Sequence, residues 1–252
     1  MKHILSRTNV DVLAQLAWTK VLLAFDFDGT LAPIVEDRDK AFMRAPTRRL
    51  VTKLCALYPC AVISGRSQSD VGARVDGVGV KYVMGNHGLE PGTGMRAFAR
   101  EISEAHRLLA SVLGGLPGLD MEDKRYSLAV HYRRSRRKRD ARDAIHAAVA
   151  KLPMQMRLIP GKMVVNVVPD RAPNKGDALL HLRNVEHAAT ALYVGDDFTD
   201  EDVFKLDQPG RLLTIRIGNS RTSSAEYFLR TQQEIDTLLG KLVSLRESRA
   251  IQ

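Results

Sequence analysis

Two carboxylates that lie one residue apart are the clearest chemical signal in the sequence. Asp26 and Asp28 follow the apolar run 21–25, and Gly29 comes directly after them. Such a run predicts a buried parallel strand, and open α/β sheets bind ligands beyond the carboxyl ends of their strands. Asp26 therefore stands where a nucleophile could act. Because two acids this close repel each other, the pair favours a bound divalent cation such as Mg²⁺.

Polar residues also follow the predicted strand 60–63 and begin a later helix. The Ser64 hydroxyl and the Gly65 amide could hold a phosphate. Lys175 follows Asn174, a good helix cap, although a lysine there opposes the helix dipole. A local conflict of this kind is typical of a functional residue. Near Asp26, Lys175 would neutralise carboxylates and bind phosphate.

A second acidic cluster follows the predicted strand 190–195. Five of the seven residues 196–202 are acidic, which is costly unless some of them face a metal or a base. We expect Asp196 to bind the metal, and Asp197 and Asp200 to support Lys175 and metal-bound water. An acidic first helical turn would explain Asp200 and Glu201, but not Asp196.

Each signal also has an ordinary structural explanation. The aspartate pair could be an acidic turn, Ser64 a helix cap, and Lys175 a surface lysine. Their order along alternating strands and helices nevertheless favours a single site on a parallel α/β sheet.

The predicted fold is an α/β parallel-sheet core, formed by residues 1–90 and 170–252, with an inserted α+β cap at 91–169. In the core, a helix at 9–18 precedes the first strand, residues 32–40 form a flap, the last strand spans 212–217, and a closing helix spans 231–246. The alternating pattern at 126–133 predicts a half-buried strand. The remaining cap elements are predicted at 96–113 (helix), 136–151 (basic helix), 154–159 and 162–168 (strands).

Composition narrows the classes of function. The first twenty residues lack the apolar core of a signal peptide, no run is long enough to span a membrane, and there are only two cysteines, which favours a cytoplasmic location. The net charge of +9 is concentrated in the arginine-rich stretch 133–142. Since aromatic residues do not interleave that stretch, we expect a solvated helix start rather than a nucleic-acid site.

The motifs together resemble a known family. The segments FDFDGTL (25–31), ISGR (63–66), GNHGLE (85–90) and GDDFTDE (195–201), with EDK (122–124), HYR (131–133) and GK (161–162), resemble trehalose-6-phosphate phosphatases of the haloacid dehalogenase superfamily. This resemblance implies a magnesium-dependent phosphatase with a Rossmann-like core and an inserted cap. Asp26 would form an aspartyl-phosphate, and Asp28 would act as general acid and base.

The same resemblance implies further roles. The metal would lie between Asp26, Asp196 and the Asp28 backbone carbonyl. Glu122, Lys124 and Lys162 would contact the sugar, and Arg66, His87 and Arg133 would line the approach. The alternation of side chains along one continuous strand does not bring Glu122 and Lys124 beside His131, so this arrangement requires the strand to be interrupted before Tyr126.

One departure from the family pattern concerns substrate choice. Asn166 and Val168 stand where the family usually has Glu and Arg, and Lys162, Val164, Asn166 and Val168 share one predicted strand face. The catalytic motifs are complete, so the identity of the sugar phosphate is what this departure affects. The alternatives are a phosphatase for another sugar phosphate, a phosphomutase, or a non-catalytic sugar-phosphate sensor.

Overall fold

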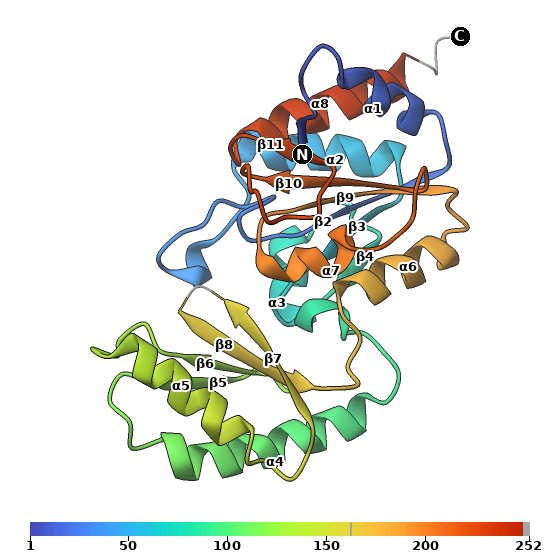
Figure 1. Cartoon of the computed structure of the whole chain (residues 1–252). Helices are drawn as coiled ribbons and strands as arrows, with labels where there is room; N and C mark the ends of the chain where they lie inside the picture. Colours follow the sequence, from blue (N-terminus) through green and yellow to red (C-terminus); the bar gives the residue numbers. More distant parts are fainter. Residues whose placement is uncertain (162, 249–252) are drawn as a thin grey trace. The chain divides into compact units, whose positions relative to one another are not determined.

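The computed structural model describes residues 1–161 and 163–248, which form two compact units. One unit contains Met1–Gly88 and the chain from Asn174 onward, and the other contains Leu89–Pro173. Figure 1 shows the elements of each. Among the described residues, no helix is long and apolar enough to cross a membrane.

The first unit is built on a seven-stranded parallel sheet in the order β1-β11-β10-β9-β2-β3-β4. Its strands are β1 (Lys2–His3), β2 (Val21–Phe25), β3 (Cys60–Ile63), β4 (Tyr82–Met84), β9 (Thr190–Gly195), β10 (Leu212–Ile217) and β11 (Tyr227–Leu229). Its helices are α1 (Val10–Ala17), α2 (Ala45–Leu57), α3 (Gln68–Val75), α6 (Lys175–Val185), α7 (Glu201–Phe204) and α8 (Glu234–Glu247), with short 3₁₀ turns η1 (Arg38–Lys40), η2 (Asn86–Gly88) and η3 (Phe198–Asp200).

Side-chain alternation along the fully buried strand β2 divides the core into two layers. Leu23 and Phe25 belong to the cluster that includes residues of α1, α2, α3 and α8, whereas Leu22 and Ala24 pack with α6 and α7. An all-apolar strand is therefore required, because both of its faces are covered. The parallel core is confirmed, but the prediction that 212–217 is the last strand is wrong: β11 follows it, and its three residues are too few to give a periodic signal.

The second unit is a four-stranded antiparallel sheet in the order β5-β6-β8-β7. Its strands are β5 (Asp120–Asp123), β6 (Leu128–His131), β7 (Met156–Gly161) and β8 (Val164–Pro169), and its helices are α4 (Met95–Leu113) and α5 (Lys138–Val149). Leu128, Val130, Val165 and Val167 pack with apolar residues of both helices. The helices therefore cover one face of the sheet (Figure 1).

The sequence did not predict β5, and the predicted strand 126–133 is shorter than expected. A hairpin separates β5 from β6, with Arg125 at φ 70° and the Lys124 amide donating to the Ser127 carbonyl at 2.9 Å. The interruption of the strand that the Glu122 placement required is thus present. Ala129 is as buried as its neighbours, so the alternation of apolar and polar positions overstated the exposure of this face.

Candidate active site

Asp26 lies at the carboxyl end of the central strand β2. This strand is flanked by β9 and β3, and the Asp26 amide donates to the Val194 carbonyl of β9 at 2.9 Å. The residue is 4% exposed. Burial is the main reason that the pKa of Asp26 is raised, to about 7, although the charge of Lys175 acts in the opposite direction.

Lys175 reaches Asp26 from the first turn of α6. Asn174 and Asp177 form a reciprocal cap that fixes the start of this helix. The Lys175 Nζ donates to Asp26 Oδ1 at 2.8 Å and to Asp200 Oδ1 at 2.7 Å, and the side chain is almost fully buried. Burial alone would lower the pKa of Lys175, but Asp200 and Asp26 outweigh it and raise that pKa. The lysine is therefore charged and is held against the proposed nucleophile.

Asp200 organises the turn that follows β9. Its Oδ2 accepts the backbone amides of Asp196 and Asp197, both at 2.9 Å, and its Oδ1 also accepts the Tyr193 hydroxyl at 2.7 Å. Gly195 is required here because a Cβ would lie 2.2 Å from the Asp200 Cγ. Each Asp200 carboxylate oxygen thus already accepts two hydrogen bonds from other groups of the protein.

Asp196 provides the observation that fits a metal. Its Oδ1 is buried and accepts no hydrogen bond from the described residues, and carboxylate oxygens of Asp26, Asp196 and Asp200 lie within 4.8 Å of one another. Burial first, and then the charge of Asp26, raise the pKa of Asp196 to about 9. Gly29, at φ 83°, leaves room for this carboxylate, since a Cβ would lie 2.1 Å from Asp196 Oδ2. Carboxylate oxygens gathered in this way suit Mg²⁺, which can take the place of the retained proton.

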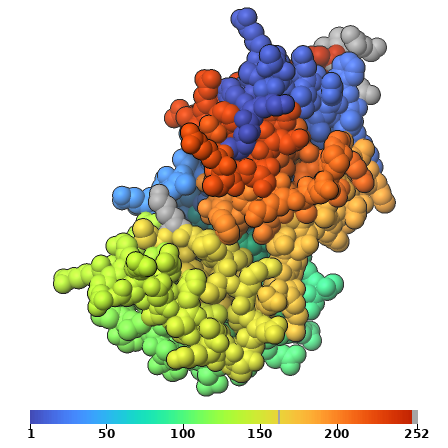
Figure 2. All heavy atoms as spheres, in the orientation of Figure 1, coloured from blue at the N-terminus to red at the C-terminus, as the bar shows by residue number. Residues whose placement is uncertain are grey.

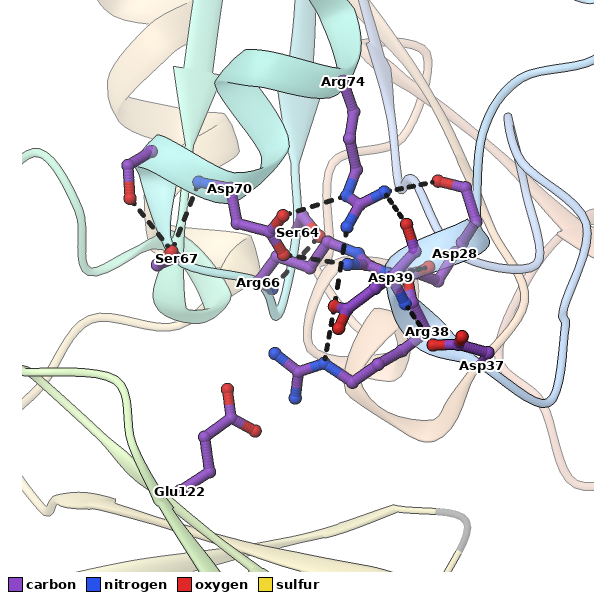
Figure 3. Close-up of polar contacts among 12 residues, drawn as sticks. Asp28, Asp37, Arg38, Asp39, Ser64, Arg66, Ser67, Asp70, Arg74 and Glu122 are labelled. Carbon is purple, nitrogen blue, oxygen red and sulfur yellow. Dashed lines mark hydrogen bonds and ion pairs between the residues drawn. The ribbon is translucent and has the colours of Figure 1, made fainter.

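The Asp28 carboxylate lies outside that cluster, in contact with Arg66. The Arg66 Nε donates to Asp28 Oδ2 at 2.6 Å and its Nη2 donates to Oδ1 at 2.7 Å (Figure 3). The metal contact expected of Asp28 was through its backbone carbonyl, and this stays a prediction. Asp197 does not contact Lys175 as expected; it is exposed and caps the η3 turn, where a carboxylate satisfies free amides.

Ser64 and His87 lie close together at the ends of β3 and β4. The Ser64 Oγ accepts the Arg66 amide at 3.2 Å, and the Ser64 carbonyl accepts the His87 amide at 2.8 Å. Gly65 was expected to give an anion access to the backbone, but a Cβ there would also meet the His87 ring at 2.5 Å. His87 itself adopts φ 60° and is buried, which fixes its ring over Gly65.

The remaining candidate residues belong to the second unit. Glu122, Ala129 and Asn166 are paired across β5, β6 and β8, so their side chains share the sheet face opposite α4 and α5. Glu122 Oε2 also lies 3.2 Å from His131 Nε2. Lys124 lies in the hairpin, Arg133 is exposed after β6, and Lys162 falls outside the described residues.

Three contributors were missed from the sequence. Tyr193 carries a hydroxyl in the fully buried strand β9, and a buried tyrosine needs a hydrogen-bond partner. Asp70 accepts a hydrogen bond from the Arg66 side chain, and Arg74 donates to the same Asp70 carboxylate. The spacing of Arg66, Asp70 and Arg74, four residues apart, is a helical ion-pair pattern that could have indicated this cluster.

Comparison with known proteins agrees with the site. The trehalose-phosphatase family model matches residues 24–233. Trehalose-phosphate phosphatase from Mycobacterium bovis is 38% identical over 199 residues, covering 73% of this chain and 51% of the relative. The same enzyme from Mycobacterium ulcerans is 33% identical over 237 residues, covering 87% and 60%. The chain thus spans little more than half the length of these relatives.

Solved structures show the same fold. The C-terminal domain of Candida albicans trehalose-6-phosphate phosphatase superposes with a TM-score of 0.79 at 21% identity, over 94% of this chain and 98% of that one. Trehalose-6-phosphate phosphatase from Aspergillus fumigatus gives a TM-score of 0.65 at 25% identity, over 98% of this chain and 100% of that one. The core is therefore of the haloacid dehalogenase type, and the chain belongs to the trehalose-phosphatase family.

Proposed function

We propose that this protein is a magnesium-dependent phosphatase that hydrolyses trehalose 6-phosphate to trehalose and phosphate. One observation carries the proposal: the buried Asp26 carboxylate at the end of the central strand, with Lys175 bound to one of its oxygens. Lys175 occupies Oδ1 and orients the group, which leaves Oδ2 for attack on phosphorus. The relatives named above support the choice of substrate.

The proposed reaction has two steps. Asp26 Oδ2 bonds to phosphorus while the bond from phosphorus to the sugar oxygen breaks, and Asp28 gives its proton to that departing oxygen. Asp28 then takes a proton from the water that hydrolyses the aspartyl-phosphate, which restores both carboxyl groups. Lys175 and the amide-rich Ser64–Gly65 turn would bind the phosphoryl oxygens.

Asp26, Asp196 and the Asp28 carbonyl would hold Mg²⁺. The cation would supply positive charge that offsets the repulsion between carboxylates and phosphate. The Asp196 Oδ1, which accepts no hydrogen bond from the described residues, supports this assignment. Asp197 and Asp200 would support the site without binding the metal themselves. Asp200 would do so by holding Lys175 and the Asp196 amide, and Asp197 by contact with metal-bound water.

We propose that the segment 91–169 is the specificity cap. In this segment Glu122, Lys124 and Lys162 would contact the sugar, Asn166 would share the sheet face of Glu122, and Arg133 would line the approach. In the first unit, Arg66 and His87 would line the approach to Asp26 without binding the sugar themselves. Asn166 and Val168 lack the charges usual in the family. An amide can bond to hydroxyls, but without the strength of a charge-assisted bond. This observation favours a second candidate, a phosphatase for a related sugar phosphate.

No nucleic-acid or membrane partner is part of the proposal, and the proposed location is the cytoplasm. The arginine-rich stretch 133–142 exposes all of its basic side chains, consistent with a solvated helix start (yellow-green atoms in Figure 2). Arg137 and Arg142 already pair with Asp140 and Asp143 of the same helix.

A phosphate-release panel tests the proposal. The purified protein is given magnesium and, in parallel, trehalose 6-phosphate, glucose 6-phosphate, sucrose 6-phosphate and 4-nitrophenyl phosphate. The proposal predicts release that stops in EDTA and is fastest with a disaccharide phosphate. Return of an isomeric phosphorylated sugar would indicate a mutase, and binding without turnover would indicate a sensor.

A further inference from the structure

Among the described residues, Arg66 supplies both of the side-chain hydrogen bonds recorded for the Asp28 carboxylate. The Asp28 side chain is 40% exposed, and both of its oxygens accept one N–H each from the planar guanidinium of Arg66. Such a two-point fork sets the position and also the plane of a carboxylate, which a single bond does not. Each Asp28 oxygen keeps a second lone pair, so proton transfer at that oxygen is not blocked.

Arg66 is in turn held from three other directions. Its Nη1 donates to Asp70 Oδ2 at 2.8 Å, its Nη2 donates to the Arg38 carbonyl at 2.7 Å, and the guanidinium carbon lies 5.9 Å from the centre of the Phe27 ring. The side chain is only 6% exposed. A buried guanidinium with this many partners has one geometry available, so it can impose that geometry on Asp28.

The network continues to the segment that follows the catalytic turn. Asp70 Oδ1 accepts from Arg74 Nε at 3.0 Å, and Arg74 Nη1 donates to the carbonyls of Asp39 and Ala41 at 3.1 and 2.9 Å (Figure 3). Two buried arginines, both bound by the single carboxylate of Asp70, therefore hold the 38–41 backbone beside Asp28.

We infer that Arg66 is the positioning residue for Asp28, and that Asp70 and Arg74 serve it by fixing Arg66 and the 38–41 segment. Arg66 thus acts on the reaction through Asp28 rather than by contact with substrate. This inference rests on the proposed function, in which Asp28 protonates the leaving oxygen. General acid catalysis needs the carboxyl within hydrogen-bond reach of that oxygen, and an unanchored, partly exposed aspartate samples several rotamers.

Substrates with different leaving groups can distinguish a role of Arg66 in positioning Asp28 from a purely structural role. The value of kcat/KM reports the steps up to departure of the alcohol. A sugar alkoxide needs a proton to leave, whereas 4-nitrophenolate leaves without one. Loss of Asp28 positioning should therefore reduce kcat/KM for the sugar phosphate much more than for 4-nitrophenyl phosphate.

The experiment compares Arg66→Lys, Asp70→Asn and a matched control, Arg183→Lys, on both substrates with magnesium. Arg183 is also 6% exposed and lies in α6, where it donates to Gln208. For Arg66→Lys we expect kcat/KM for the best sugar phosphate to fall ten- to a hundredfold further than kcat/KM for the aryl phosphate. Asp70→Asn should show a smaller selective loss, and Arg183→Lys none.

Combining Arg66→Lys with Asp28→Asn gives a second, independent readout. If Arg66 acts only through Asp28, adding Arg66→Lys to Asp28→Asn should cause no further selective loss of kcat/KM for the sugar phosphate. Equal losses on both substrates, or additive losses in the double variant, would overturn the inference while leaving the phosphatase function intact. A wild-type protein that cleaves no sugar phosphate would instead remove the proposed function, and this inference with it. Asp70→Asn keeps the test decisive if Arg66→Lys does not fold.

Discussion

Replacing Asp196 by Asn should make the metal-free protein more stable while abolishing its response to magnesium. Burial and the neighbouring Asp26 raise the pKa of Asp196 to about 9, from 3.8 in an unstructured chain. At pH 7 the folded state must therefore keep a proton that the unfolded state releases. The neutral amide of Asn has the same shape and carries no such cost.

The magnitude follows from the two pKa values. The unfolded-state pKa of 3.8 lies 3.2 pH units below pH 7. At about 1.4 kcal/mol per pH unit, keeping the proton in the folded state lowers the free energy of unfolding by about 4 kcal/mol. Asp196 is partly exposed, so solvent reduces this value, and we expect a gain of about 2–4 kcal/mol. The folded state binds more protons between pH 4 and 9, so wild-type stability should fall as pH rises through that window, with a smaller slope in Asp196→Asn.

Denaturant unfolding in EDTA and in excess magnesium measures both effects. A ligand at a hundred times its dissociation constant stabilises a protein by about 2.7 kcal/mol, which we expect for the wild type and not for the variant. Asp197→Asn is the matched control, because it makes the same Asp-to-Asn change at an exposed neighbour. A variant that is less stable than wild type in EDTA at pH 7 would show that the buried Asp196 does not destabilise the metal-free protein. A variant that gains as much stability from magnesium would show that Asp196 does not bind the metal.

Three further predictions concern the neighbouring side chains. Lys175→Met should abolish turnover and cost about 3–5 kcal/mol in denaturant unfolding, because it leaves two buried carboxylates without their cation; an active, stable variant would contradict this. Tyr193→Phe should cost about 1–2 kcal/mol and lower kcat, since Asp200 loses one donor; unchanged kcat and stability would show that the bond is dispensable. Asn166→Glu with Val168→Arg should raise kcat/KM for trehalose 6-phosphate about ten- to a hundredfold and leave 4-nitrophenyl phosphate nearly unchanged; a loss would mean that these positions do not contact the sugar.

The core of the site was predictable because strand ends of a parallel sheet meet at one edge. Asp26 follows β2 and Asp196 follows β9, which are adjacent strands, so a motif at each end already implies proximity. Lys175 was predictable for a different reason: its unfavourable position at a helix start indicated a constraint beyond helix stability. The family resemblance added the catalytic roles.

The parts that could not be predicted depend on tertiary contacts. Strand β5, with the sequence DMED, has no apolar alternation, and only its pairing with β6 makes it a strand. The Asp28–Arg66 contact joins residues 38 positions apart, and nothing in the local pattern selects it over contact with substrate. Asp196 and Asp197 look alike in the sequence, whereas the folded turn orients Asp196 inward and leaves Asp197 exposed, where it caps η3.

Trapping of the phosphorylated enzyme shows directly whether Asp26 is the nucleophile. Wild-type protein is mixed with magnesium and its best sugar phosphate, quenched in acid within one turnover, digested, and analysed by mass spectrometry. We expect one phosphoryl group on the peptide that contains residues 21–31, located on Asp26, and none in an Asp26→Asn protein that no longer releases phosphate. Continued phosphate release by Asp26→Asn, or a phosphoryl group on another residue, would contradict this expectation.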